Sequence, residues 1–227
     1  MEIKSVTLQT TKLTEMKDFY INKLGFNLTE ESDNSFRITV GSSELAFTSN
    51  GVITSNPYYH FAFNIPSNKF IEAKTWIKDR VSLNLEEGQD EVHFTQLPAR
   101  AIYFDDPSGN VVEFISRYSM KTNQTESFSI KSVLNISEIG VTVNDVYSAA
   151  ESLNIVGVTE RDNGDIRKHN LNFMGNRKNG VFIILNEPGR RWIFSEKISI
   201  PFPLSIILSN NIKVDVNSEG NLIVYHY

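Results

Sequence analysis

The stretch Ala101-Ile-Tyr-Phe-Asp-Asp-Pro-Ser-Gly-Asn-Val-Val-Glu-Phe-Ile115 decides the fold of this chain. It joins two β-rich runs through a turn of Pro, Ser, Gly and Asn, and the second run carries one carboxylate, Glu113, among apolar neighbours. A charge inside an apolar strand costs several kcal/mol unless it is paired or coordinated. The stretch therefore predicts a strand, a turn and a second strand that presents Glu113 to a polar pocket.

Two other segments place a chelating side chain in a similar position. Residues Phe36–Phe47 form a β-rich run, a Gly turn and a run containing Glu44, while His60 lies near the start of the apolar run Tyr58–Ile65. Two carboxylates and one imidazole within strands suggest a shared pocket, for which a divalent metal is a suitable occupant. Strand register decides where each side chain points, so Glu44 could instead be solvated and His60 could be a buried histidine bonded to a backbone carbonyl.

The order of the predicted elements repeats along the chain and indicates an α+β fold. Residues 1–52 and 58–118 each predict one strand, one helix and three further strands, a βαβββ module. Residues 119–128 are polar and rich in Ser and Thr, which is typical of a linker. Residues 129–227 predict a fainter, degenerate third module followed by a C-terminal hairpin, whose turn is Asn217–Asn221.

Composition excludes several classes of function. The 227 residues include 22 basic and 27 acidic side chains, and the net charge of −5 argues against nucleic acid as the main partner. The absence of cysteine excludes disulfides, thiolate zinc sites and cysteine nucleophiles. No apolar run approaches the roughly 20 residues that span a bilayer. The segment Met1–Val6 lacks the pattern of a signal peptide, so we expect a cytoplasmic protein without membrane contact.

Three motifs resemble the vicinal-oxygen-chelate superfamily, which includes glyoxalases, extradiol dioxygenases, fosfomycin-resistance enzymes and bleomycin-binding proteins. They are Phe19–Phe26, Tyr59–Phe63 and, most specifically, Tyr103–Glu113. The resemblance implies that the first two modules pair, with curved mixed sheets enclosing a cavity. It also implies that metal ligands come from the first and last strands of each module.

By this resemblance, the metal ligands map onto Ser5, Glu44, His60 and Glu113. Ser5 departs from the pattern, because a neutral hydroxyl is a poor ligand for a divalent metal beside carboxylates and an imidazole. The remaining set of His60, Glu113 and Glu44 is still sufficient, since catalytic metal sites commonly use three protein ligands and keep open positions.

The third module matches this pattern less well. Glu138 holds its first-strand position, but its last strand, Val181–Leu185, has no carboxylate. We therefore interpret Glu138 as structural, and the third module as a structural or substrate-facing addition.

Three further side chains are candidates for catalysis. His93 lies in a short strand 20 residues before Glu113, where it could act as a general acid or base or as a fourth ligand, or else be an exposed histidine on a hairpin. Arg100 follows in the next turn and could hold an anionic substrate, and Tyr103 could line the pocket.

These residues favour a metal-dependent enzyme that acts as a Lewis acid on a small oxygen-chelating substrate, with lyase, isomerase, thiol-transferase and dioxygenase chemistry all open. His60, His93 and Glu113 would suit Fe(II), whereas Glu44 in place of His93 would suit Mn, Ni, Zn or Mg. The alternative is a metal-free protein of the bleomycin-resistance type that binds or sequesters a small molecule. Because paired modules often dimerise, a homodimer is a further hypothesis.

Overall fold

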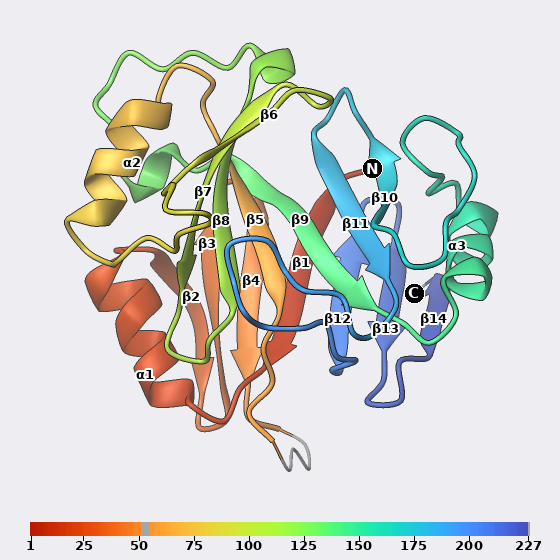
Figure 1. Cartoon of the computed structure of the whole chain (residues 1–227). Helices are drawn as coiled ribbons and strands as arrows, with labels where there is room; N and C mark the ends of the chain where they lie inside the picture. Colours follow the sequence, from red (N-terminus) through yellow and green to blue (C-terminus); the bar gives the residue numbers. More distant parts are fainter. Residues whose placement is uncertain (51–54, 227) are drawn as a thin grey trace.

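The computed structural model describes residues 1–50 and 55–226, which form two curved seven-stranded sheets with helices packed against them (Figure 1). The predicted α+β class is confirmed, and the first two modules each have the predicted order of one strand, a helix and three further strands. None of the helices in the described residues is long and apolar enough to cross a membrane.

One sheet combines the first module with the end of the chain. Its strand order is β14-β13-β12-β1-β4-β3-β2, and β1 pairs with β12 in antiparallel fashion, with Val6 opposite Ile206. The strands are β1 (Ile3–Gln9), β2 (Asn27–Ser32), β3 (Ser35–Val40), β4 (Ser43–Thr48), β12 (Leu204–Leu208), β13 (Ile212–Val216) and β14 (Leu222–His226).

The other sheet combines the second and third modules. Its strand order is β10-β11-β9-β5-β8-β7-β6, and β5 pairs with β9 in antiparallel fashion, with Ala62 opposite Glu138. The strands are β5 (His60–Ile65), β6 (Val92–Phe94), β7 (Ala99–Asp105), β8 (Val111–Arg117), β9 (Asn135–Thr142), β10 (Asn172–Asn176) and β11 (Val181–Asn186).

The helices bury apolar stripes in the core that the two sheets share. The first helix buries Met16, Phe19 and Tyr20 and is followed by Gly25, whose φ of +83° is a conformation that glycine adopts readily. The helices are α1 (Leu13–Lys17), the π-helical turn η1 (Asp18–Lys23), α2 (Phe70–Lys78), the 3-10 turns η2 (Tyr118–Met120) and η3 (Ile130–Ser132), and α3 (Val146–Ile155).

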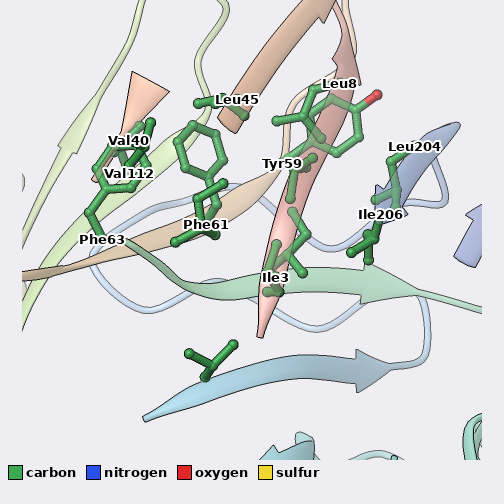
Figure 2. Close-up of a cluster of buried hydrophobic side chains, with 14 of the residues drawn as sticks. Ile3, Leu8, Val40, Leu45, Tyr59, Phe61, Phe63, Val112, Leu204 and Ile206 are labelled. Atoms are coloured by element: carbon green, nitrogen blue, oxygen red, sulfur yellow. The ribbon is translucent and has the colours of Figure 1, made fainter. Parts of the chain in front are cut away.

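Side chains from both sheets meet in this core. Figure 2 shows Leu8 and Leu45 of one sheet in the same cluster as Phe61 and Val112 of the other. Phe61 and Val112 lie on one face of their sheet, and Ala62 and Glu113 lie on the opposite face, because side chains alternate along a strand. The first face supports the core, which leaves the second face available for the polar site.

The predicted pairing of the first two modules is wrong. The first module pairs with β12, β13 and β14, and the second pairs with the third. A βαβββ module leaves one edge of its first strand open, and local pattern does not say which other strand will cover it. Contacts distant in sequence make that choice, through the apolar residues of β12 against β1 and those of β9 against β5. The predicted module end at residue 52 lies outside the described residues.

The C-terminal segment forms three strands where the sequence predicted a two-stranded hairpin. The run 205–214 divides into β12 and β13 at Asn210 and Asn211, which have φ values of +68° and +57°. Asparagine tolerates this left-handed conformation and therefore permits the three-residue turn, 209–211, between the paired Leu208 and Ile212. The predicted turn Asn217–Asn221 does join β13 to β14.

The third module is degenerate, as expected. In place of one middle strand, the described residues contain an isolated bridge between Glu160 and Met174. Of the predicted linker, residues 119–128, the first two belong to η2 and the rest hold no helix or strand, but Phe128 is buried against Trp76 and Phe114. This segment is therefore packed against the second module.

Candidate metal centre

His60, Glu113 and Glu138 form a buried cluster on one face of the second sheet. One ligand atom from each lies within 4.8 Å of the others, and His60 Nε2 is 3.6 Å from Glu113 Oε2 and 4.0 Å from Glu138 Oε2. Ala62 lies two residues after His60 in β5. It is paired with Glu113 of β8 on one side and with Glu138 of β9 on the other. The two-residue spacing puts all three side chains on the same face.

A hydrogen bond to the backbone orients the imidazole. His60 Nδ1 lies 3.0 Å from the carbonyl oxygen of Val111, and since a carbonyl oxygen only accepts, Nδ1 carries the proton. Burial lowers the pKa of His60, which favours the neutral ring. The lone pair of Nε2 therefore faces the two glutamates, in the tautomer that a metal-binding histidine uses.

The two glutamates differ in charge compensation. Glu138 forms an ion pair with the buried Arg117. Burial and the nearby Glu138 carboxylate raise the pKa of Glu113 well above its ordinary value, although Arg117 and the Tyr103 hydroxyl act in the opposite direction. Within the described residues, Glu113 Oε1 is buried without a hydrogen-bond partner. A divalent cation would supply the missing positive charge, so the donor set fits a metal.

The turn before β8 holds Glu113 in register. The carboxylate of Asp106 accepts hydrogen bonds from the backbone N–H groups of Ser108 and Asn110, both at 3.0 Å. It also accepts one from the Tyr20 hydroxyl at 2.8 Å, which ties the turn to the first module. Gly109 has a φ of +82°, which favours glycine at this position. The Asp-Pro-Ser-Gly-Asn motif is thus the local reason that β8 begins where it does.

The cluster lies in a cavity of about 590 Å³. This volume is within the range of roughly 300–1,000 Å³ that is typical of small-molecule sites. Its walls combine the buried cluster with aromatic, aliphatic and arginine side chains, including Tyr103, Ile115, Arg117, Arg161, Leu171, Phe173, Ile184, Arg190 and Trp192.

The segment 187–203 between β11 and β12, here called the strap, covers part of this cavity (blue in Figure 1). The Trp192 ring lies 5.0 Å from that of His60, and the Phe194 ring stacks on Tyr103 at 4.6 Å. Arg191 forms an ion pair with Glu86, which also accepts a hydrogen bond from the backbone of Phe194 at 2.8 Å. These contacts place an aromatic cover over the cluster.

Of the three predicted ligands, the structure brings His60 and Glu113 together but not Glu44. Glu44 lies in the first sheet, where its half-exposed carboxylate is 3.1 Å from Arg37 Nη1. Ser5 is its neighbour across β1 and β4 and accepts a hydrogen bond from the same Arg37 at 2.9 Å. The prediction of Glu44 as a ligand fails because the first and second modules lie in different sheets.

Glu138 takes the place predicted for Glu44. The sequence signal was present, because Glu138 holds the first-strand position of the third module, but the missing carboxylate in β11 led us to interpret it as structural. Ile184 of β11 lines the cavity on that side. The third module thus supplies one chelating side chain and one apolar wall.

The three predicted catalytic residues have different positions. Tyr103 is buried in the cavity wall and is paired with Glu113 across β7 and β8. His93 is exposed at the cavity rim, outside the buried cluster, and its ring lies 5.8 Å from that of Tyr118. Arg100 stacks on Phe70 at 4.1 Å and lies 2.7 Å from Glu91, so its guanidinium is engaged away from the cavity.

Comparison with protein families agrees with this geometry. Residues 2–114 match the Glyoxalase/Bleomycin resistance protein/Dioxygenase superfamily. The chain is a member of the vicinal-oxygen-chelate superfamily. This confirms the predicted family. Residues 136–190, which contain Glu138, match a family described as toxoflavin-degrading enzyme. The comparison with curated protein sequences gave no match.

Comparison with solved structures found similarity over all or about half of this chain. A provisionally named dioxygenase from Bacillus subtilis is 14% identical, with 99% of this chain and 84% of that chain covered and a TM-score of 0.60. A lactoylglutathione lyase from Agrobacterium tumefaciens is 18% identical, with 50% of this chain and 91% of that chain covered and a TM-score of 0.42. The fosfomycin resistance protein of Listeria monocytogenes is 20% identical, with 52% of this chain and 90% of that chain covered and a TM-score of 0.40.

Proposed function

We propose that this vicinal-oxygen-chelate protein is a divalent-metal-dependent enzyme acting on a small oxygen-chelating molecule. The observation that carries the proposal is the buried group of His60, Glu113 and Glu138, with one carboxylate oxygen of Glu113 left without a partner in the described residues. The match of residues 136–190 to an enzyme family supports an enzyme over a binding protein, because that segment supplies Glu138.

The ligand set favours an oxygen-preferring metal. Two carboxylates and one imidazole suit Mn(II) well, whereas the two-histidine, one-carboxylate set of Fe(II) oxygenases would need His93. His93 is exposed at the rim and lies outside the cluster. When bound, the metal would act as a Lewis acid that polarises oxygen atoms of the substrate. Of the metals left open by the sequence, we therefore propose Mn(II) ahead of Fe, Ni, Zn and Mg.

The protein's own residues would bind and shield the substrate. His60, Glu113 and Glu138 would hold the metal, while Trp192 and Phe194 of the strap would exclude water from the cluster. The Tyr103 hydroxyl adjoins Glu113, and burial raises the pKa of Tyr103 well above its ordinary value. Tyr103 would therefore remain protonated and donate a hydrogen bond to a substrate oxygen.

The test is a titration of the purified protein with Mn(II), followed by calorimetry and by electron paramagnetic resonance. We expect one tightly bound Mn(II) per chain and loss of binding in His60→Ala and Glu113→Ala. Glu44→Ala is the matched control, since it removes a carboxylate of the first sheet and should leave binding unchanged. Wild-type protein that binds no divalent metal near neutral pH would overturn the proposal.

A metal-free binding protein is the second candidate. Arg117 favours it, because its ion pair with Glu138 already compensates one of the two buried carboxylates. A small-molecule partner is common to both candidates. The homodimer and the cytoplasmic location stay predictions from the sequence.

A further inference from the structure

We infer that Arg161 and Arg190 form an anion-binding subsite in the cavity, so that the substrate is a small acidic molecule with an apolar body. This inference rests on the proposed function in one respect: the other end of the substrate would bind the metal held by the buried cluster. Both arginines line the cavity that contains His60, Glu113 and Glu138.

Arg161 has hydrogen-bonding capacity that its neighbours do not use. Its guanidinium stacks on the Phe173 ring at 4.4 Å, and within the described residues its buried Nε has no hydrogen-bond partner. Two carboxylates lie within ion-pair distance, with Nε 3.7 Å from Glu160 Oε1 and 3.5 Å from Asp162 Oδ2, but neither accepts a hydrogen bond from Nε. Asp162 is already bound by Arg177. A stacked guanidinium with free donors is a common receptor for a carboxylate, sulfonate or phosphonate.

Adjacent arginines in the strap serve different purposes. Arg191 is occupied, since it forms an ion pair with Glu86 and donates to the carbonyl oxygen of Ser195 at 2.8 Å. Arg190 has no carboxylate within 4 Å in the part of the chain that the structure describes, and it is exposed where it lines the cavity. Arg191 therefore holds the strap against Glu86 of the second module, while the guanidinium of Arg190 remains available to bind a ligand.

The charge distribution around the cavity supports an acidic ligand. Two of the four arginines that line it, Arg117 and Arg191, are paired with Glu138 and Glu86, and Arg161 is partly compensated by Glu160 and Asp162. Arg190, which has no carboxylate within 4 Å in the described residues, leaves a positive charge at the opening in a chain whose net charge is −5. Such a local field attracts anions. The aromatic and aliphatic walls, with Phe173 and Trp192 among them, would take the apolar part of the molecule.

The test compares two fluorescent probes that differ in one anionic group, 8-anilinonaphthalene-1-sulfonate and neutral N-phenyl-1-naphthylamine, on protein freed of metal by a chelator. The Trp76→Phe background leaves Trp192, which lines the cavity, as the single tryptophan, so the efficiency of energy transfer reports how close a bound probe lies to it. We expect the sulfonate probe to bind at least about tenfold more tightly than the neutral probe, a difference that is typical of a charge-assisted contact.

Arg161→Gln and the exposed Arg190→Gln should each remove most of this preference and leave the neutral probe unaffected. Arg167→Gln is the matched control, because Arg167 is an exposed arginine of the same module that does not line the cavity. Equal affinity for the two probes, no binding of the sulfonate, or an equal effect of the control would overturn the inference.

Measurement of Mn(II) binding on the same variants separates the two proposals. Mn(II) binding without a sulfonate preference would remove the anion subsite and leave the proposed metal function standing. A sulfonate preference that depends on Arg161 and Arg190 without Mn(II) binding would remove the metal function and leave the subsite.

Discussion

Glu113 and Glu138 lie on opposite sides of one residue, Ala62, each paired with it from a neighbouring strand. They come from different modules, so the site exists because the second and third modules share a sheet. Two buried carboxylates this close repel each other unless a cation lies between them or one of them holds a proton. The predictions below follow from this arrangement and from the contacts that maintain it.

Glu138 should matter for metal binding, although the ligand assignment from the sequence excluded it. We expect Glu138→Gln to weaken Mn(II) binding by roughly 100-fold or more, since a three-ligand site loses a charged donor. Calorimetry measures the change, and Glu44→Gln is the matched control. Equal Mn(II) affinity in wild type and Glu138→Gln would show that Glu138 is not a ligand.

Glu113 should make the metal-free protein less stable as the pH rises. The pKa of Glu113 in the folded state is raised above 4.5, so the folded protein holds a proton that the unfolded chain releases. Its contribution to stability is therefore present below pH 4.5 and is lost as the pH rises through the folded pKa. Glu113→Gln should be more stable than wild type, by a margin that grows with pH above 4.5. Urea unfolding at several pH values tests this, and a constant margin would contradict it.

Gly140 should be required for the position of the strap. A Cβ atom at residue 140 would lie 2.7 Å from the Trp192 indole, closer than van der Waals contact allows. We expect Gly140→Ala to displace Trp192 and to cost about 1–3 kcal/mol of unfolding free energy, as overpacking does. A red shift of Trp192 emission in the Trp76→Phe background would report the displacement. Unchanged emission together with unchanged stability would show that the strap accommodates the methyl group.

Asp106 should be needed for the turn that sets the register of β8. It is buried and accepts hydrogen bonds from Tyr20, Ser108 and Asn110, so Asp106→Ala leaves several buried donors without a partner. We expect a loss of about 2–4 kcal/mol of unfolding free energy. The neighbouring Asp105→Ala, which removes a more exposed ion pair with Lys197, should cost less than about 1 kcal/mol. Urea denaturation compares the two, and similar losses would contradict a special role for Asp106.

Much of the site was predictable from local sequence. The motif Tyr103–Glu113 indicated the hairpin and the ligand at its end, and the apolar run containing His60 indicated the strand beside it. Glu44 looked equivalent to Glu113, because each lies in the last strand of a module, but the structure places it in another sheet beside Arg37. Arg100 failed for a different reason: it was predicted in a turn but lies in β7, three residues before Tyr103 and therefore on the opposite face of that strand, against Phe70.

The sequence by itself determined the βαβββ order, the family and two of the three clustered side chains, because periodicity and turn chemistry act over a few residues. Only the tertiary structure decided that the second module pairs with the third, that Glu138 completes the cluster and that the strap covers it. The physical reason is that each first strand offers a similar open edge. The choice of partner for that edge depends on the burial of apolar surface by residues far apart in the chain.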